Sequence, residues 1–136
     1  MHEPVLAANQ SFYDAFCALD LNAMNGVWAH TPDVVAIHPG WPILRGWSEV
    51  QASWRDIFAN CASMTIQPTD VEITVTGPVA RVSCIENLLT VMQGQSIHGR
   101  IACTNLFHQV DGVWRMVLHH GSPMSLASGN APVGDA

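Results

Sequence analysis

The sequence predicts an α+β fold in which helices come first and an antiparallel meander of strands follows. Apolar residues recur at helical spacing in two N-terminal segments and again after Gly46. From Val71 onward they alternate with polar residues in segments separated by tight-turn dipeptides, which is typical of antiparallel strands. Because the helices and the paired strands occupy separate parts of the chain, this order favours α+β.

The first half of the chain predicts three helices and one short strand. A first helix from about Pro4 to Leu19 carries an apolar stripe, and Asp20 can cap a shorter second helix. The segment from Val34 to His38 has the β-branched density of a short buried strand. The third helix begins after Gly46, and one of its sides carries the apolar residues Trp47, Val50, Trp54, Ile57, Phe58 and Cys61.

The stretch from Ile97 to Pro123 predicts a hairpin that turns at Asp111-Gly112. If Val110 pairs with Val113, Cys103 lies opposite His120, while His119 points to the other face as a surface or interface residue. One face is then apolar, with only a thiol, an amide and an imidazole as its polar groups. Its residues are Ile101, Cys103, Asn105, Phe107, Trp114, Met116, Leu118 and His120.

Two further strands are expected over Val71–Thr76 and Val79–Leu88, joined at Gly77-Pro78 so that Thr76 pairs with Val79. A turn near Gln93 would then place Glu86 opposite Cys103. The result is a row of Glu86, Cys103 and His120 across three strands. The backbones of Glu86 and His120 would lie roughly 10 Å apart, so that a water or a bound molecule could join them.

Composition excludes several function classes. The length predicts one domain over residues 1–123, followed by a flexible tail over 124–136 that is rich in Ala, Gly, Ser and Pro. The net charge is −6 and the five basic residues are scattered, so nucleic acid is not an expected partner. No long apolar run predicts a membrane span, and the first ten residues lack a signal-peptide pattern, so we expect a cytoplasmic protein.

Motifs along nearly the whole chain resemble the SnoaL-like branch of the nuclear transport factor 2-like superfamily, which includes ketosteroid-isomerase-like proteins. The matching pieces are SFYDAF followed by Asp20, IHPGW, GWSEVQASW, TNLF and DGVWRMVLHHGSP. The resemblance implies a cone-shaped, curled sheet closed by the helices around a deep pocket, in a protein that is frequently dimeric. It does not imply one reaction, because this superfamily hosts many chemistries and also proteins without a catalytic role.

The chain also departs from the pattern of these enzymes. Ketosteroid isomerases use a Tyr and a protonated Asp as oxyanion donors. The only Tyr here, Tyr13, lies in the first helix, and no residue of this chain is matched to that Tyr. A steroid substrate is therefore not supported. SnoaL-type cyclases use a pocket Asp, but Glu86 is the only carboxylate placed mid-strand on the predicted inner face.

The candidate site residues follow from this face and from the segments expected to cover it. Catalytic roles are assigned to Glu86, His120 and His38, although each could be a hydrogen-bonded structural residue instead. The expected substrate-binding residues are Asn105, Trp41, Trp47, Trp54 and Cys103. No metal site is predicted, because no two histidines share a helical face and His119 and His120 project oppositely. A Cys103 nucleophile lacks the electropositive setting of a thiolate.

The sequence therefore favours a cofactor-free enzyme that performs acid/base chemistry on a small organic ligand by isomerisation, cyclisation, dehydration or hydrolysis. The alternative is a non-catalytic ligand-binding or assembly module of the same fold. Ala102, Thr104, Leu106 and Val117 leave the outer face of the sheet rather apolar, which motivates a homodimer through that face.

Overall fold

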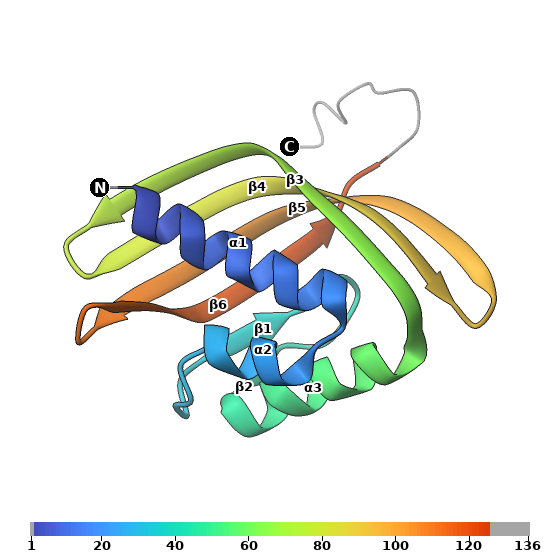
Figure 1. The fold of residues 1–136 in the computed structure, drawn as a ribbon, viewed down its shortest axis with the longest axis horizontal. Helices are drawn as coiled ribbons and strands as arrows, with labels where there is room; N and C mark the ends of the chain where they lie inside the picture. The colour runs from blue at the N-terminus through green and yellow to red at the C-terminus, as the bar shows by residue number, and fades with distance from the viewer. Residues whose placement is uncertain (1, 126–136) are drawn as a thin grey trace.

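The computed structural model describes residues 2–125, in which three helices cover one face of a six-stranded sheet (Figure 1). The helices are α1 (Glu3–Ala18), α2 (Leu21–Val27) and α3 (Trp47–Asn60). The strands are β1 (Val35–Ile37), β2 (Leu44–Arg45), β3 (Cys61–Thr76), β4 (Val79–Met92), β5 (Gln95–Val110) and β6 (Val113–Pro123). Their order is β2-β1-β6-β5-β4-β3, and only β1 and β6 run parallel among the described pairs.

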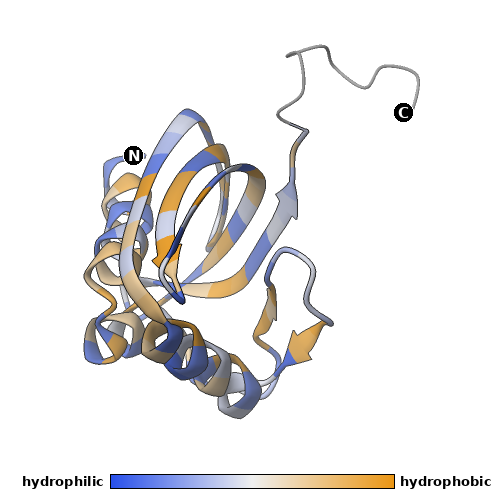
Figure 2. Ribbon diagram, turned by 90° about the vertical axis from the view of Figure 1, so that its right-hand side faces the viewer, coloured by the Kyte–Doolittle hydropathy of each residue, from blue (hydrophilic) through white to orange (hydrophobic). Residues whose placement is uncertain are grey.

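The predicted α+β fold with a curled antiparallel meander is confirmed. The long strands bend around α1 without closing into a barrel (Figure 2). None of the helices within residues 2–125 is long and apolar enough to cross a membrane. One domain over 1–123 stays a prediction, and residues 126–136 of the predicted tail lie outside the described residues.

Local sequence explains where the first two helices begin and end. Pro4 lies in the first turn of α1, where a missing N–H costs nothing, and Leu19 ends the helix with a φ of 53°. Asp20 caps α2 as predicted, because its side chain accepts a hydrogen bond of 3.1 Å from the Ala23 N–H. The buried side of α1 places Phe12 and Tyr13 against the inner face of the sheet.

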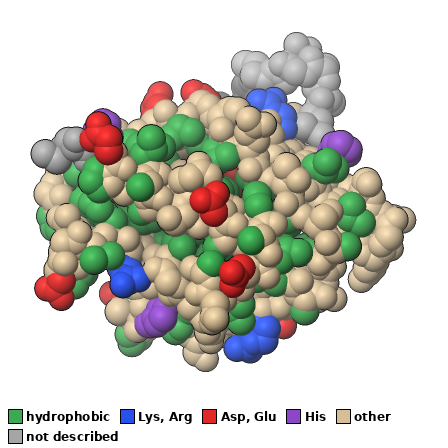
Figure 3. All heavy atoms as spheres, viewed as in Figure 1, with side chains coloured by type: hydrophobic (Ala, Val, Ile, Leu, Met, Phe, Trp, Pro, Cys, Tyr) green, Lys and Arg blue, Asp and Glu red, His purple; other side chains and the backbone are tan. Residues whose placement is uncertain are grey.

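The aromatic residues of the helices form the core over this face. Phe12 contacts the rings of Phe16 and Trp54 edge to face, with centroids 5.8 and 5.6 Å apart. Trp54 and Trp28 are both almost fully buried. On the side of the molecule shown in Figure 3, charged side chains are scattered singly among apolar and polar ones and form no basic patch.

The hairpin of β5 and β6 follows the predicted register only near its turn. Val110 pairs with Val113 and Phe107 with Met116, as predicted, but a bulge then pairs Leu106 with Leu118. One extra residue in β6 exchanges the two faces for everything beyond it. The predicted pairing of Cys103 with His120 is therefore wrong. His119 is buried on the inner face, opposite Asn105, whereas His120 pairs with Thr104 and is exposed.

Gly121 takes the place opposite Cys103 that was predicted for His120. A β-carbon at this position would lie 2.9 Å from Cγ2 of Ile101 and 3.3 Å from the ring of Pro39. A side chain does not fit there without movement of its neighbours. The shifted register thus seats a glycine at a position where a side chain would be crowded.

The hairpin of β4 and β5 turns at Gln93-Gly94, so Met92 pairs with Gln95 and Glu86 pairs with Ile101. The predicted pairing of Glu86 with Cys103 is wrong by two residues, because Cys103 lies opposite Cys84 instead. A shift of two residues along a strand leaves a side chain on the same face of the sheet. Glu86 therefore still points to the inner face of the sheet, where it is 5% exposed.

Candidate functional site

A cluster of polar side chains is buried between α1 and the inner face of the sheet. We call it the inner polar cluster; none of its residues is more than 6% exposed, and they are Asn9 and Tyr13 of α1, Cys84 and Glu86 of β4, Cys103 and Asn105 of β5, and His119 of β6. Residues four apart share one side of a helix, and residues two apart share one face of a strand. The periodicity of each element thus places its polar groups on one side, and the packing of α1 on the sheet brings them together.

A chain of hydrogen bonds runs through the inner polar cluster from His119 to Glu86. Nδ1 of His119 lies 2.8 Å from Oδ1 of Asn105. Nδ2 of Asn105 donates to Asn9 over 2.9 Å and to the Tyr13 hydroxyl over 3.3 Å. The Tyr13 hydroxyl in turn donates to Oε2 of Glu86 over 2.6 Å. Since a carboxamide oxygen only accepts, His119 carries its proton on Nδ1 and leaves Nε2 basic.

Burial decides the charge of these groups. It raises the pKa of the Glu86 carboxyl, while the hydrogen bond from Tyr13 acts in the opposite direction. Burial, followed by the charge of Glu86, raises the pKa of Tyr13. Burial also lowers the pKa of His119 well below its usual value. At neutral pH the His119 imidazole and the Tyr13 phenol are therefore uncharged. The pKa of the Glu86 carboxyl lies closer to neutral pH than that of an exposed Glu.

His38 lies beside this cluster, at the end of β1. Its Nε2 is 2.9 Å from the Ser53 hydroxyl, which itself donates to the carbonyl of Val50 over 2.6 Å. The single hydroxyl proton is thus used, so His38 donates from Nε2 and keeps Nδ1 as an acceptor. Burial lowers the pKa of His38 to about 4. Its ring centroid is 4.7 Å from that of Trp54 and 5.9 Å from that of His119.

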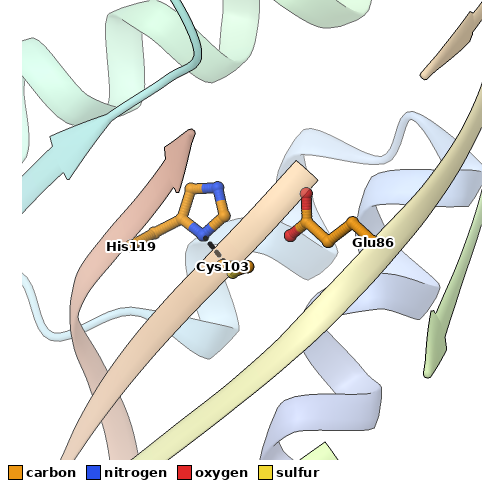
Figure 4. Close-up of side chains that lie close together, drawn as sticks. All are labelled: Glu86, Cys103 and His119. Atoms are coloured by element: carbon orange, nitrogen blue, oxygen red, sulfur yellow. Dashed lines mark hydrogen bonds between the residues drawn. The ribbon is translucent and has the colours of Figure 1, made fainter. Parts of the chain in front are cut away.

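Glu86, Cys103 and His119 are also the residues of the cluster that could hold a metal ion, since one ligand atom from each lies within 4.8 Å of the others (Figure 4). Coordination would compete with existing bonds, because Tyr13 holds Glu86 and Asn105 holds Nδ1 of His119. It would also need the Cys103 thiolate, whereas contact with the Cys84 thiol and burial raise the pKa of Cys103. Metal binding would thus require the inner polar cluster to exchange these hydrogen bonds for metal ligation.

Comparison with known proteins assigns the fold to a family. The model of the SnoaL-like domain matches residues 5–126. The chain belongs to the SnoaL-like family. The resemblance found in the sequence is thereby confirmed. This SnoaL-like chain is also similar in fold to a nuclear transport factor 2-like protein from Salmonella enterica, with a TM-score of 0.83 at 18% identity over 95% of both chains.

Solved structures with higher identity carry different descriptions. A provisionally assigned dehydratase of the NTF2-like family from Streptomyces avermitilis is 32% identical, with a TM-score of 0.83 over 90% of this chain and 95% of that one. A provisionally assigned association domain of calcium/calmodulin-dependent protein kinase type II from Thiobacillus denitrificans is 34% identical, with a TM-score of 0.78 over 88% and 94% of the two chains. The family therefore does not by itself define a reaction.

One curated relative is a longer protein. The F-box protein SKIP8 of Arabidopsis thaliana is 28% identical over 120 residues, which are 88% of this chain and 49% of that protein. The SnoaL-like chain thus spans about half the length of the curated relative it matches.

The structure brings some of the predicted site residues together and separates others. Glu86, Asn105 and Cys103 lie in the inner polar cluster, and Trp54 lies against His38. His120 does not reach the cluster: the bulge in β6 turns it to the outer face, where it borders a hollow of about 410 Å³.

The other two predicted tryptophans lie at the edge of the molecule's interior. Trp41 is 40% exposed and reaches only the edge of the His38 ring, at a centroid distance of 5.0 Å. Trp47 stacks on His30 at 4.4 Å, away from the cluster. Neither residue belongs to the inner polar cluster, and their role in binding a substrate stays a prediction.

Sequence reasoning missed five residues of the site: Asn9, Tyr13, Ser53, Cys84 and His119. Asn9 and Tyr13 are four residues apart and next to the apolar stripe of the first helix, so their shared side could have been recognised. The inward turn of His119 depends on the bulge in β6, opposite Leu106 and Phe107, for which we find no local signal in the sequence.

Proposed function

We propose that this SnoaL-like domain is a cofactor-free acid/base enzyme, in which Glu86 exchanges a proton with a small organic substrate. The observation that carries the proposal is the 2.6 Å hydrogen bond from Tyr13 to a buried carboxyl. Isolation from water raises the pKa of Glu86 toward neutrality. Such a group can take a proton from a carbon acid or deliver one to a leaving oxygen.

The remaining residues of the hydrogen-bonded chain would orient the reacting groups. Asn105 donates to Tyr13 and accepts from His119, which leaves the Tyr13 hydroxyl proton directed at Glu86. A substrate oxygen that replaces the carboxylate as the acceptor of this proton would be stabilised as negative charge develops on it. Tyr13 is thus the oxyanion donor of the proposed site, and Asn105 is a positioning residue.

The substrate would enter beside Glu86. This residue is 5% exposed, whereas Tyr13, Asn105 and His119 are at most 1% exposed, so the chain of hydrogen bonds approaches the surface at its carboxyl end. Because Glu86 is buried, binding would have to displace side chains that cover the carboxyl. The dehydratase description of the Streptomyces relative supports elimination of water as one reaction of this class.

Deuterium exchange tests the proposal with simple carbon acids in place of the natural substrate. We expect the protein to speed the exchange of α-protons in some members of a panel of small enolisable ketones and β-hydroxycarbonyl compounds in D₂O, followed by NMR. Glu86→Gln should lower that rate by about 10²- to 10⁴-fold, the usual contribution of a general base. Glu72→Gln, a change of an exposed carboxylate on β3, is the matched control and should exchange like the wild type. Equal rates for Glu86→Gln and wild type would contradict the proposal.

An assembly module is the second candidate, and the outer face of the sheet favours it. Leu106 is only partly buried there, and Leu89 is 40% exposed. A second copy of the chain would cover this apolar face. The association-domain description of the Thiobacillus relative points the same way. Catalysis and assembly are compatible, so each needs its own test.

Light scattering tests the homodimer directly. We expect a mass of twice 14.7 kDa at micromolar concentration, and a monomer mass for Leu106→Arg, because a buried charge at the centre of the interface lacks a partner. Val110→Arg at the exposed turn of β5 and β6 is the control and should stay dimeric. A wild-type mass of 14.7 kDa would rule out the interface.

A further inference from the structure

Two cysteines face each other in the inner polar cluster, and the acid/base proposal uses neither. Cys84 of β4 and Cys103 of β5 are direct partners in the antiparallel ladder. Both are buried, at 6% and 4% exposure. Their sulfur atoms lie 3.5 and 3.4 Å from the same atom, the hydroxyl oxygen of Tyr13. The two side chains therefore leave the same face and converge on one point.

This placement matches the backbone geometry of a disulfide. Directly opposed residues of an antiparallel pair have α-carbons about 4.5 or 5.5 Å apart, depending on the type of pair. Disulfides join α-carbons that are about 4.4–6.8 Å apart. The strands therefore need no shift of register to bring the two sulfurs into bonding distance. The remaining step is a side-chain rotation that moves the sulfurs off Tyr13 and toward each other.

We propose that Cys84 and Cys103 form a reversible disulfide when the protein is exposed to a hydroperoxide. This inference goes beyond the proposed acid/base function and does not depend on it. The pair differs from Cys17 and Cys61, which are more exposed and whose thiols contact Ile66 and Thr90 rather than another cysteine.

The chemistry balances with the hydroperoxide as the oxidant. Cys84 loses its proton, its thiolate attacks the outer oxygen of the hydroperoxide, and the O–O bond breaks. The outer oxygen stays on the sulfur as a sulfenic acid, and the leaving alkoxide (hydroxide, for hydrogen peroxide) takes up the proton as an alcohol (water). The Cys103 sulfur then attacks the Cys84 sulfur, the S–O bond breaks, and the departing hydroxide takes the Cys103 proton as water. Contacts with the Cys103 thiol and the Tyr13 hydroxyl lower the pKa of Cys84 and outweigh burial, which raises it; the lowered pKa suits the first step.

Oxidation would change the surroundings of Tyr13. In the reduced form both thiols contact its hydroxyl, and a disulfide removes both S–H groups from that contact. The new bond also joins β4 and β5 two residues from Glu86 and two residues from Asn105. If the proposed function is correct, the disulfide thereby alters the same donor that holds the catalytic carboxyl.

A tryptic map tests the connectivity directly, because the chain contains five basic residues, all Arg, which separate the four cysteines. Cleavage places Cys17 in residues 1–45, Cys61 in 56–81, Cys84 in 82–100 and Cys103 in 101–115. Folded protein treated with hydrogen peroxide should yield one linked pair, 82–100 with 101–115, which a thiol reductant separates again. Protein oxidised in concentrated urea should instead give a mixture of pairs.

Two variants make the test decisive. Cys84→Ser should abolish the linked pair and leave Cys103 reduced, whereas Cys17→Ser should leave the pair unchanged. A cooperative melt of each variant shows that it is folded. The proposal is overturned if the folded wild type links other cysteines, or if Cys84 and Cys103 stay reduced while Cys17 and Cys61 oxidise. Neither result bears on deuterium exchange by Glu86, so the two proposals fail separately.

Discussion

Replacing Tyr13 by Phe should lower the free energy of unfolding by about 2–3 kcal/mol, because it removes the hydrogen-bond donor of a buried carboxyl. Tyr13 is 1% exposed and Glu86 is 5% exposed, so water cannot readily replace the lost hydroxyl. The same change also takes an acceptor from Nδ2 of Asn105, which keeps its bond to Asn9. Urea unfolding of the two proteins measures the difference.

A double-mutant cycle assigns this loss to the contact itself. In the Glu86→Gln background the carboxyl charge is absent, and Tyr13→Phe should cost at least about 1 kcal/mol less than in the wild type. Glu86→Gln alone should unfold cooperatively, with a stability close to that of the wild type. If the cost of Tyr13→Phe is the same in both backgrounds, Tyr13 stabilises the fold by packing and not through Glu86. A strong loss of stability in Glu86→Gln alone would mark Glu86 as a structural acid.

Acid should destabilise the protein through His38. Its pKa is about 4 in the folded protein and near 6.5 in the unfolded chain, so the unfolded chain binds the proton first as the pH falls. The stability that the neutral ring contributes is complete above pH 6.5 and is lost as the pH falls from there toward 4. A pKa difference of this size corresponds to about 3 kcal/mol. The lowered pKa of His119 adds a loss of the same sign.

His38→Gln isolates this contribution. Glu86 acts with the opposite sign. Because its pKa is raised in the folded protein, the stability that it contributes is lost as the pH rises above 4.5, the usual pKa of a Glu. Both proteins contain Glu86, so the difference between their stability curves reports His38 alone. We expect the variant to be less stable at pH 7, because the contacts with Ser53 and Trp54 are altered, but to lose less stability in acid. Parallel curves from pH 7 to pH 4 would contradict a buried neutral His38.

Patterns close together in the sequence determined the helices, the turns and the face of most strand residues. Asp20 caps its helix by a bond that spans three residues, and the turn at Asp111-Gly112 sets the pairing of Val110 with Val113. The alternation of side chains along β4 was enough to predict that Glu86 points to the inner face. The predicted partner of Glu86 was wrong by two residues, but a shift of two residues leaves Glu86 on the same face. These features depend on neighbouring residues, which the sequence displays.

Only the tertiary structure decided which polar groups meet in the inner polar cluster. The bulge in β6 gave the inner position to His119 and placed His120 outside, because a strand has only two faces and one extra residue exchanges them. The shifted register also places Gly121 opposite Cys103, where it is tight against Ile101 and Pro39. Tyr13 meets Glu86 across 73 residues of chain, a contact that depends on how α1 lies over the curled sheet. Local periodicity determines the face of an element but not the angle at which two elements pack, and this angle made Tyr13 a member of the site.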